Sequence, residues 1–365
     1  MTDTDEPVRP RRDWRVLSAV IAVCFVLSVG EHTPLPYLDA LAFARHLEAT
    51  QGGSARLSVF ALGLAPFISA LTGLELLKLA VPRFAAWIAR EPKAYRAAML
   101  VVAAFALVSA AMQGTGISVA LAAMGLVAED TLSQVAVTVT LLAGVAVLIL
   151  VSQSIRLQRL PIGGVWLVIA LPAAGSIVAE FGQLLELLRI GAVDTPLVAA
   201  AFALSLSAIT AIVFLATALE KCVRAAGGDP FHWTPILVWP PLIAGSIANF
   251  IVSLVFEFMP IAPTLSFFDH DTLWSLAFSL LVPIIVYLYA RAITRSVPGA
   301  ATWFGKRSVL TFVSLAQISI CVGPFLASNL LSPLPINSTL IVIVVAFWAI
   351  SRQFLAPRAH LIGQS

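Results

Sequence analysis

Apolar segments long enough to cross a membrane occupy most of this 365-residue chain. A bilayer-spanning helix needs roughly 17–25 mostly apolar residues. Only 11% of the residues are charged and 60% are hydrophobic, whereas a soluble domain carries about 25% charged residues. Ten segments qualify, at about 14–30, 56–80, 95–115, 132–153, 162–187, 197–219, 234–257, 272–293, 307–330 and 335–353. We therefore predict an all-α polytopic membrane protein with ten transmembrane helices and no separate soluble domain.

The distribution of Lys and Arg among the connections predicts the orientation, because cytoplasmic connections are enriched in these residues. Nineteen of the 22 lie on one side. Only Arg45, Arg56 and Arg189 lie on the other side. Both termini are therefore predicted to be cytoplasmic. The ten segments divide into two halves, 1–190 and 191–365, with five predicted helices each. An odd number per half gives the halves opposite orientation, as in inverted-repeat membrane folds.

Residue patterns typical of enzymes and metal proteins are absent from the sequence. It has no H-E-x-x-H motif, no phosphate-binding glycine loop followed by Lys and no paired carboxylates on one helix face. The three cysteines, Cys24, Cys222 and Cys321, are odd in number and lie in or beside apolar segments, so we predict neither disulfides nor a metal site. We expect a protein that is not an enzyme, needs no cofactor and binds no nucleic acid.

Away from the span ends, the predicted spans contain two acidic residues, Glu75 and Glu180. Ion-coupled transporters place such residues near the middle of the membrane, where a charge is costly and functional. Both positions here are nearer an end of their span, which argues against ion coupling. Between the first two spans, the segment 39–50 has the apolar spacing of a short amphipathic helix that is too short to cross the membrane.

The segment that contains the second span resembles the second transmembrane helix of the SecY/Sec61 family. Its sequence GGSARLSVFALGLAPFISA matches the family pattern at Gly52, Gly53, Leu57, Ser58, Phe60, Ala61, Leu62, Gly63, Pro66, Ile68, Ser69 and Ala70. Further stretches resemble the family in the same order along the chain. They are SVGEHTPLPYLD (28–39), 95–117, 140–164, TPILVWPPLIAGSIANFI (234–251) and STLIVIVVAFWAISRQ (338–353).

The resemblance implies a protein-conducting channel in which two five-helix halves enclose a pore. In that family an apolar ring seals the pore, a short segment plugs it from outside, and a lateral gate opens between helices two and three and helices seven and eight. An apolar constriction excludes ions by dewetting. Carried over by position, the ring would comprise Ile68, Thr72, Ile169, Ala173, Leu242 and Ile341, of which Ile169 and Ala173 rest on an ambiguous alignment. The plug would comprise about 39–50, with Asp39, Leu41, Ala44, Leu47 and Thr50.

The same resemblance implies partners and a location. A SecE-like small subunit would hold the two halves together, with SecG as a further candidate, and unfolded polypeptides would be the substrate. The location would be the bacterial cytoplasmic (inner) membrane. SecA or a ribosome would dock on the cytoplasmic loops after helices six and eight. The candidate docking residues are Lys221, Arg224, Arg291, Arg295, Lys306 and Arg307.

Two departures from the family pattern keep other functions open. The two docking loops shrink to about 220–233 and 294–305, and Thr72 stands where the family usually has Ile, which predicts a wider or leakier ring. One alternative is a degenerate SecY-fold scaffold or insertase without channel activity. The other is an inverted-repeat secondary transporter, which predicts carboxylates near the middle of the membrane or ligand-lined discontinuous helices that the sequence does not show.

Overall fold

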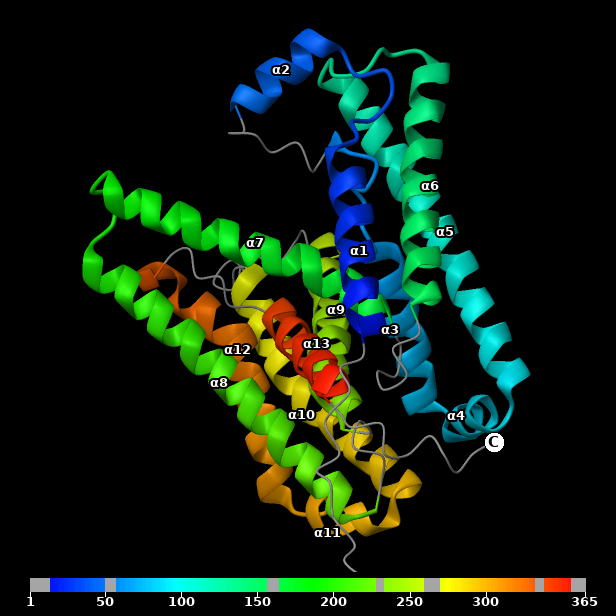
Figure 1. Cartoon of the computed structure of the whole chain (residues 1–365), viewed down its shortest axis with the longest axis vertical. Coiled ribbons are helices and arrows are strands. Elements are labelled where there is room, and N and C mark those ends of the chain that lie inside the picture. The colour runs from blue at the N-terminus through cyan, green and yellow to red at the C-terminus, as the bar shows by residue number, and fades with distance from the viewer. Residues whose placement is uncertain are drawn as a thin grey trace, which may run out of the picture.

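The computed structural model of the chain describes residues 14–49, 57–155, 164–227, 233–258, 270–331 and 338–355. In these ranges the regular structure is helical, apart from two isolated β-bridges. The helices are α1 (Trp14–His32), α2 (Ala40–Ala49), α3 (Ala65–Ala80), α4 (Pro82–Arg90), α5 (Pro92–Ala123), α6 (Thr131–Ser154), α7 (Gly164–Arg189), α8 (Thr195–Ala225), α9 (Thr234–Phe258), α10 (His270–Ser296), η3 (Pro298–Ala300), α11 (Ala301–Phe304), α12 (Arg307–Leu331) and α13 (Ser338–Leu355). Figure 1 shows their arrangement.

Each of the ten predicted spans contains one long helix. By length and apolarity, six of the described helices can cross a membrane, or seven if the bent pair α3–α4 counts as one crossing. The six are α5, α6, α7, α8, α9 and α10. The apolar parts of α1, α12 and α13 are shorter. The chain is thus an all-helical, multi-pass membrane protein, and the count of ten crossings remains a prediction.

The predicted helix over 56–80 is wrong in its first part. Residues 57–64 form turns, and α3 begins only at Ala65. Pro66 stands in the first turn of α3, where its missing N–H is harmless; further inside the helix its ring would clash with the preceding turn. Gly63 has φ +54°, a left-handed conformation that glycine adopts without a steric penalty. These two residues stop the helix that the apolar composition alone predicts.

The turn at 57–64 is held by neighbouring helices. A Cβ atom on Gly144 of α6 would collide with the backbone oxygen of Val59, and one on Gly30 of α1 would collide with the ring of Phe60. Both glycines therefore allow the turn to approach the helix backbones closely. The resemblance to the SecY/Sec61 family pointed to this segment. It did not reveal that the segment packs against Gly30 and Gly144, which belong to other helices.

At its other end α3 meets α4 at an angle of 110°. Val81 separates the two helices, and Pro82 opens α4. Helix α4 is amphipathic, since Ile88 is buried whereas Arg83 and Arg90 are exposed. The sequence analysis placed only a basic connection here. The structure adds a short amphipathic helix, and the bend falls at Pro82, which has no backbone N–H with which to continue the hydrogen bonds of α3.

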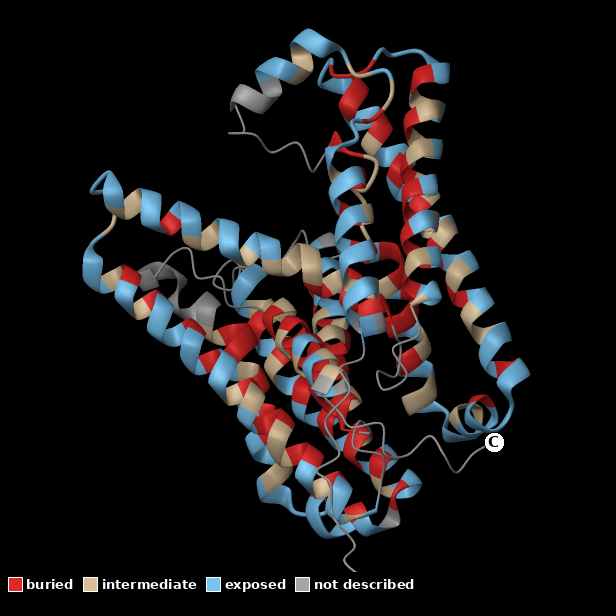
Figure 2. Cartoon of the chain, in the orientation of Figure 1, coloured by how far each residue is buried: buried red, intermediate tan, exposed pale blue. Residues whose placement is uncertain are grey.

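One continuous core joins the two predicted halves (Figure 2). Its buried side chains come from α1, α3, α5, α6 and α7 on one side and from α8, α9, α10, α12 and α13 on the other. Across the boundary, α13 packs on α7 and α1, while α3 packs on α9 and α10. We call this boundary the seam.

Candidate pore and the seam between the halves

The six predicted ring residues lie on four helices that meet at the seam. Ile68 and Thr72 are on α3, Ile169 and Ala173 on α7, Leu242 on α9 and Ile341 on α13. Ile341 is buried in the continuous core, and the other four apolar residues pack against it. The Thr72 hydroxyl donates to the Ile68 carbonyl oxygen at 2.8 Å, so its proton is used within α3. That the six surround one passage remains a prediction.

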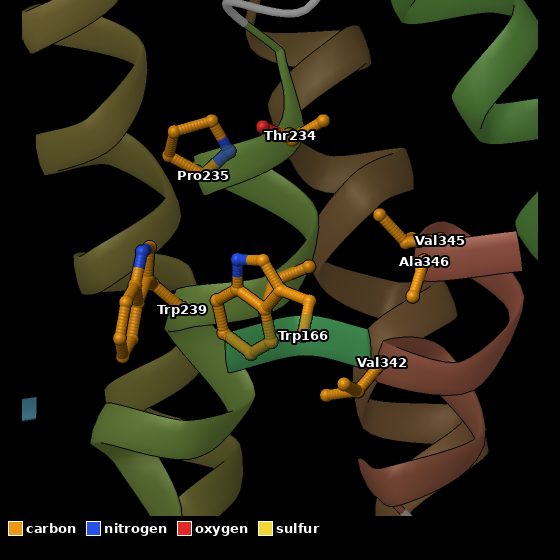
Figure 3. A pocket seen from close by; sticks show the side chains of 8 residues that line it. Trp166, Thr234, Pro235, Trp239, Val342, Val345 and Ala346 are labelled. Atoms are coloured by element: carbon orange, nitrogen blue, oxygen red, sulfur yellow. The ribbon is translucent and has the colours of Figure 1, made fainter. Parts of the chain in front are cut away.

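An aromatic pair that the sequence analysis missed lies beside these residues. The indole rings of Trp166 (α7) and Trp239 (α9) meet edge to face, with centroids 5.2 Å apart and planes at 66°. Their exposed fractions are 5% and 2%. Figure 3 shows Trp166 between Trp239 and the α13 side chains Val342, Val345 and Ala346. The sequence spacing could have indicated this pair, because each tryptophan precedes a predicted ring residue by three positions and therefore lies about one helical turn from it.

The void enclosed by these side chains is very small. Its volume is about 10 Å³, and a cavity needs roughly 10–15 Å³ to admit a single water molecule. The walls are largely apolar, and a buried water needs polar partners. The void beside the two indole rings therefore has room for about one water molecule at most.

A polar contact crosses the seam between α3 and α10. Glu75 is 8% exposed, and its Oε1 atom lies 2.6 Å from Lys78 Nζ. The Tyr289 hydroxyl of α10 donates to Glu75 Oε2 at 3.3 Å. Sequence reasoning identified Glu75, but its partner lies 214 residues away and belongs to the other half, so no local pattern could reveal it.

Replacing Tyr289 with Phe should weaken the seam. The change removes the hydroxyl that reaches Glu75 and keeps the ring. A hydrogen bond to a charged group contributes about 1.5–3 kcal/mol, and at 3.3 Å we expect the lower part of this range. Thermal denaturation in mild detergent measures the change, with Tyr287→Phe on the exposed face of α10 as the matched control. Equal stability of the two variants would contradict a role for this bond.

The predicted plug segment forms α2, beside the ends of α5 and α6 that residues 124–130 connect. Asp39 Oδ1 accepts the N–H groups of Leu41 and Ala42 at 2.9 and 2.8 Å, and the Asp39 N–H donates to the Leu126 carbonyl. Leu41 is 62% exposed, and Ala44 is also exposed. The Leu47 side chain and Thr50 lie outside the described residues. In Figure 1, α2 lies apart from α9 and α13, so here it does not reach the predicted ring.

The six candidate docking residues are all exposed and lie at or beside the ends of α8, α10, α11 and α12, at one end of the structure (Figure 1). Two of them have structural contacts as well. Arg224 lies 2.5 Å from Glu220, and the Lys306 ammonium lies 5.0 Å from the centroid of the Trp303 ring. The structure therefore groups these cations, and their docking role remains a prediction.

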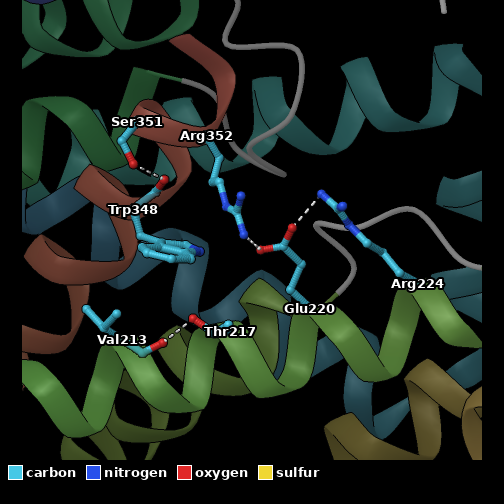
Figure 4. Close-up of polar contacts among 7 residues, drawn as sticks. All are labelled: Val213, Thr217, Glu220, Arg224, Trp348, Ser351 and Arg352. Atoms are coloured by element: carbon cyan, nitrogen blue, oxygen red, sulfur yellow. Dashed lines mark hydrogen bonds and ion pairs between the residues drawn. The ribbon is translucent and has the colours of Figure 1, made fainter. Parts of the chain in front are cut away.

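Glu220 is a buried carboxylate between two arginines (Figure 4). Its side chain on α8 is 4% exposed, with Arg224 at 2.5 Å and Arg352 of α13 at 3.5 Å. The Arg352 guanidinium also lies 5.0 Å from the Trp348 ring centroid. This cluster joins α8 to α13 beside the predicted docking surface. Among the described residues, no group of three or more His, Cys, Asp or Glu side chains could hold a metal ion.

Helix α9 contains two adjacent prolines with an external partner. Pro240 and Pro241 have no N–H groups to donate to the carbonyls of Ile236 and Leu237. Gln317 of α12 fills both vacancies, because its Nε2 atom donates to the Ile236 oxygen at 2.9 Å and to the Leu237 oxygen at 3.1 Å. The prolines predict that some donor is needed, but the sequence does not say which.

Comparison with known proteins identifies relatives of the chain. No protein-family model matches it. Protein translocase subunit SecY of two strains of Staphylococcus epidermidis is 27% identical to it over 229 residues. The match covers 58% of the chain and 52% of the relative, so it spans about half of the length of the curated relatives.

The fold is similar to two solved channels. One is a SecY translocation channel whose plug domain stabilises the closed state and maintains a membrane seal, at TM-score 0.55 and 12% identity. The other is a protein-conducting channel, at TM-score 0.53 and 10% identity. Both comparisons cover 97% of this chain and 94% of the other chain. In sequence and in fold, the chain is SecY-like.

Proposed function

We infer that this SecY-like chain forms the channel of a protein translocase, through which unfolded polypeptides cross or enter the cytoplasmic membrane. One observation carries the proposal: the fold follows that of two translocation channels over 97% of the chain. The packing of α3, α7, α9 and α13 supports it, because these helices carry all six predicted ring residues and meet at the seam. A narrow apolar constriction there would exclude ions by dewetting.

The proposed lateral gate lies between α3 and α5 on one side and α9 and α10 on the other. Support comes from the contacts of α3 with α9 and α10, which include the Glu75–Tyr289 hydrogen bond. This hydrogen bond would hold the gate closed. When a polypeptide separates the helices, water would replace it by bonding to Glu75 and Tyr289. Helix α2 would act as the plug after moving from its position at the outer end of α5 and α6.

The proposed location is the bacterial inner membrane, with both termini in the cytoplasm, as the Lys and Arg distribution predicts. A SecE-like subunit would hold the seam together, with SecG as a further candidate. SecA or the ribosome would dock on the exposed cations at the ends of α8, α10 and α12. Only the short elements η3 and α11 connect α10 to α12. Such a partner would therefore have only a short loop to bind.

Ion leak through the reconstituted protein tests the ring. Ile68→Asn and Ile341→Asn each place an amide in the apolar constriction, so they should wet it and raise the ion conductance on the order of tenfold or more. Ile21→Asn on the exposed face of α1 is the matched control, measured in the same planar bilayers. If both ring variants conduct like the unchanged protein, the ring assignment is wrong.

Affinity purification from native membranes tests the partners. Recovery of a SecE-like small subunit in mild detergent would support an active translocase. Recovery of the chain alone, under conditions that keep a known SecY–SecE pair together, would favour the second candidate, a scaffold or insertase without channel activity. One observation favours that candidate: side chains fill the region between α7, α9 and α13 in this structure.

A further inference from the structure

We propose that Trp166 and Trp239 form a second closure of the proposed channel, one helical turn to the cytoplasmic side of the predicted ring. This inference rests on the proposed function for the existence of a passage. It assigns a role to two residues that the ring, the plug and the lateral gate do not include. We call Trp166, Trp239, Val342, Val345 and Ala346 the aromatic layer.

The position of the aromatic layer follows from helix direction and spacing. Helices α7 and α9 begin after connections that are predicted to be cytoplasmic, and α13 ends at one. On α7 and α9, the tryptophans precede Ile169 and Leu242 by three residues. On α13, which runs the opposite way, Val345 follows Ile341 by four residues. Three or four residues are one helical turn, about 4.5–6 Å. All three helices therefore place Trp166, Trp239 and Val345 about one turn to the same side of the ring, whereas Val342 directly follows Ile341.

The contacts of the layer show how it would close the passage. Trp166 comes from the first half of the chain, whereas Trp239 and the α13 residues come from the second (Figure 3). The edge-to-face contact at 5.2 Å thus bridges the seam. An aromatic pair of this geometry adds about 0.5–1.5 kcal/mol beyond the burial of its surface. The void beside these side chains, about 10 Å³, has room for no more than about one water molecule.

Large flat side chains suit a closure that must open. Only two χ angles need to change to move an indole ring aside, whereas several aliphatic side chains would have to move to open an equal area. Trp166 lies in the first turn of α7, two residues after Gly164. Separation of the two halves would break the Trp166–Trp239 contact and open the layer together with the seam.

Thiol labelling provides the deciding test. Val345→Cys is introduced into full-length protein whose own cysteines are replaced by Ala. The protein is reconstituted in lipid vesicles and treated from the cytoplasmic side with a charged, membrane-impermeant thiol reagent. With both tryptophans in place, the introduced thiol should react slowly. Trp166→Ala with Trp239→Ala should accelerate its labelling about tenfold or more, because local opening then costs at least about 1.4 kcal/mol less.

A second aromatic pair, between α7 and α8, provides a control away from the proposed passage; Phe181 is partly buried and Phe202 is 43% exposed. Phe181 and Phe202 stack between α7 and α8 with centroids 4.4 Å apart, and Leu184 is buried beside Phe181. Leu184→Cys is combined with Phe181→Ala and Phe202→Ala. Loss of this pair should not admit the charged reagent, because the pair does not lie on the proposed passage. Equal acceleration in both systems would mean that the tryptophans only fill space, and would overturn the proposal.

Conductance of the same variants separates this proposal from the proposed function. If Ile68→Asn conducts and the tryptophan variants leave Val345→Cys protected, the channel stands and the aromatic closure is wrong. If the tryptophan variants expose Val345→Cys while even Ile68→Asn combined with Trp166→Ala and Trp239→Ala does not conduct, the layer does close a water-filled entrance, and the proposed through-channel is wrong. Gel filtration of each variant confirms that it remains folded.

Discussion

Replacing Gln317 with Leu should destabilise the folded chain by about 2–6 kcal/mol, because it leaves two buried carbonyl groups without donors. Each buried polar group that loses its partner costs about 1–3 kcal/mol. The two groups are the carbonyls of Ile236 and Leu237, which both receive hydrogen bonds from Gln317 Nε2. Both residues are buried, so water cannot replace the lost donor.

The two prolines of α9 make this prediction specific. In the variant with Pro240→Ala and Pro241→Ala, the backbone N–H groups of residues 240 and 241 return and can donate to the same two carbonyls. In that background, Gln317→Leu should cost less than about 1 kcal/mol, the size of a typical net hydrogen bond. The difference between the two backgrounds is the coupling energy of a double-mutant cycle.

Denaturation in mild detergent measures the four proteins of this cycle. Gln113→Leu is the control for the substitution itself, since Gln113 is an exposed residue of α5 that donates to Ser109 within its own helix. It should change stability little. An equal loss from Gln317→Leu with and without the prolines would contradict the proposed role of its amide.

The pattern of apolar residues predicted the helices well, because a helix that crosses a membrane must be apolar over about 20 consecutive residues. It placed one helix in each of ten segments. It failed at the start of α3 because Gly63 and Pro66 override composition locally, and it underestimated α5 and α8, which continue beyond their apolar parts. The predicted spans 95–115 and 197–219 became Pro92–Ala123 and Thr195–Ala225, since a helix can extend into the polar region where its hydrogen bonds remain internal.

The partners of the predicted residues could not be read from the sequence. Glu75 was recognised as an unusual acid, but its contact with Tyr289 depends on how two distant helices cross. Gln317 was not predicted to have a role, because it lies in an apolar segment. The prolines of α9 nevertheless leave two carbonyls that need a donor from elsewhere. In both cases a polar group needed a partner for reasons visible in the sequence, and only the packing of the helices identified that partner.

Removing both arginines around Glu220 should destabilise the chain more than removing Glu220 itself. Arg224→Ala with Arg352→Ala leaves a carboxylate that is 4% exposed without its cations. Removal of the partner of a buried charge costs about 3–5 kcal/mol. Both arginines are about half exposed, so water can enter where they stood, and we expect about 2–4 kcal/mol. Glu220→Gln leaves two arginines that water can already solvate, and should cost less than about 1 kcal/mol.

Chemical denaturation of these variants in detergent decides between a structural and a purely surface role of the cluster. Arg291→Ala with Arg295→Ala, which removes two exposed cations of α10, is the control and should be nearly neutral. Greater loss from Glu220→Gln than from the double arginine variant would reverse the expected asymmetry and contradict the argument. If the asymmetry is found, Arg224 helps to neutralise the buried Glu220 that joins α8 to Arg352 of α13, in addition to any docking role. Loss of SecA or ribosome binding in an Arg224 variant would then reflect a displaced helix as much as a missing contact, so Lys221, Arg291, Arg295 and Arg307 are the better probes of docking.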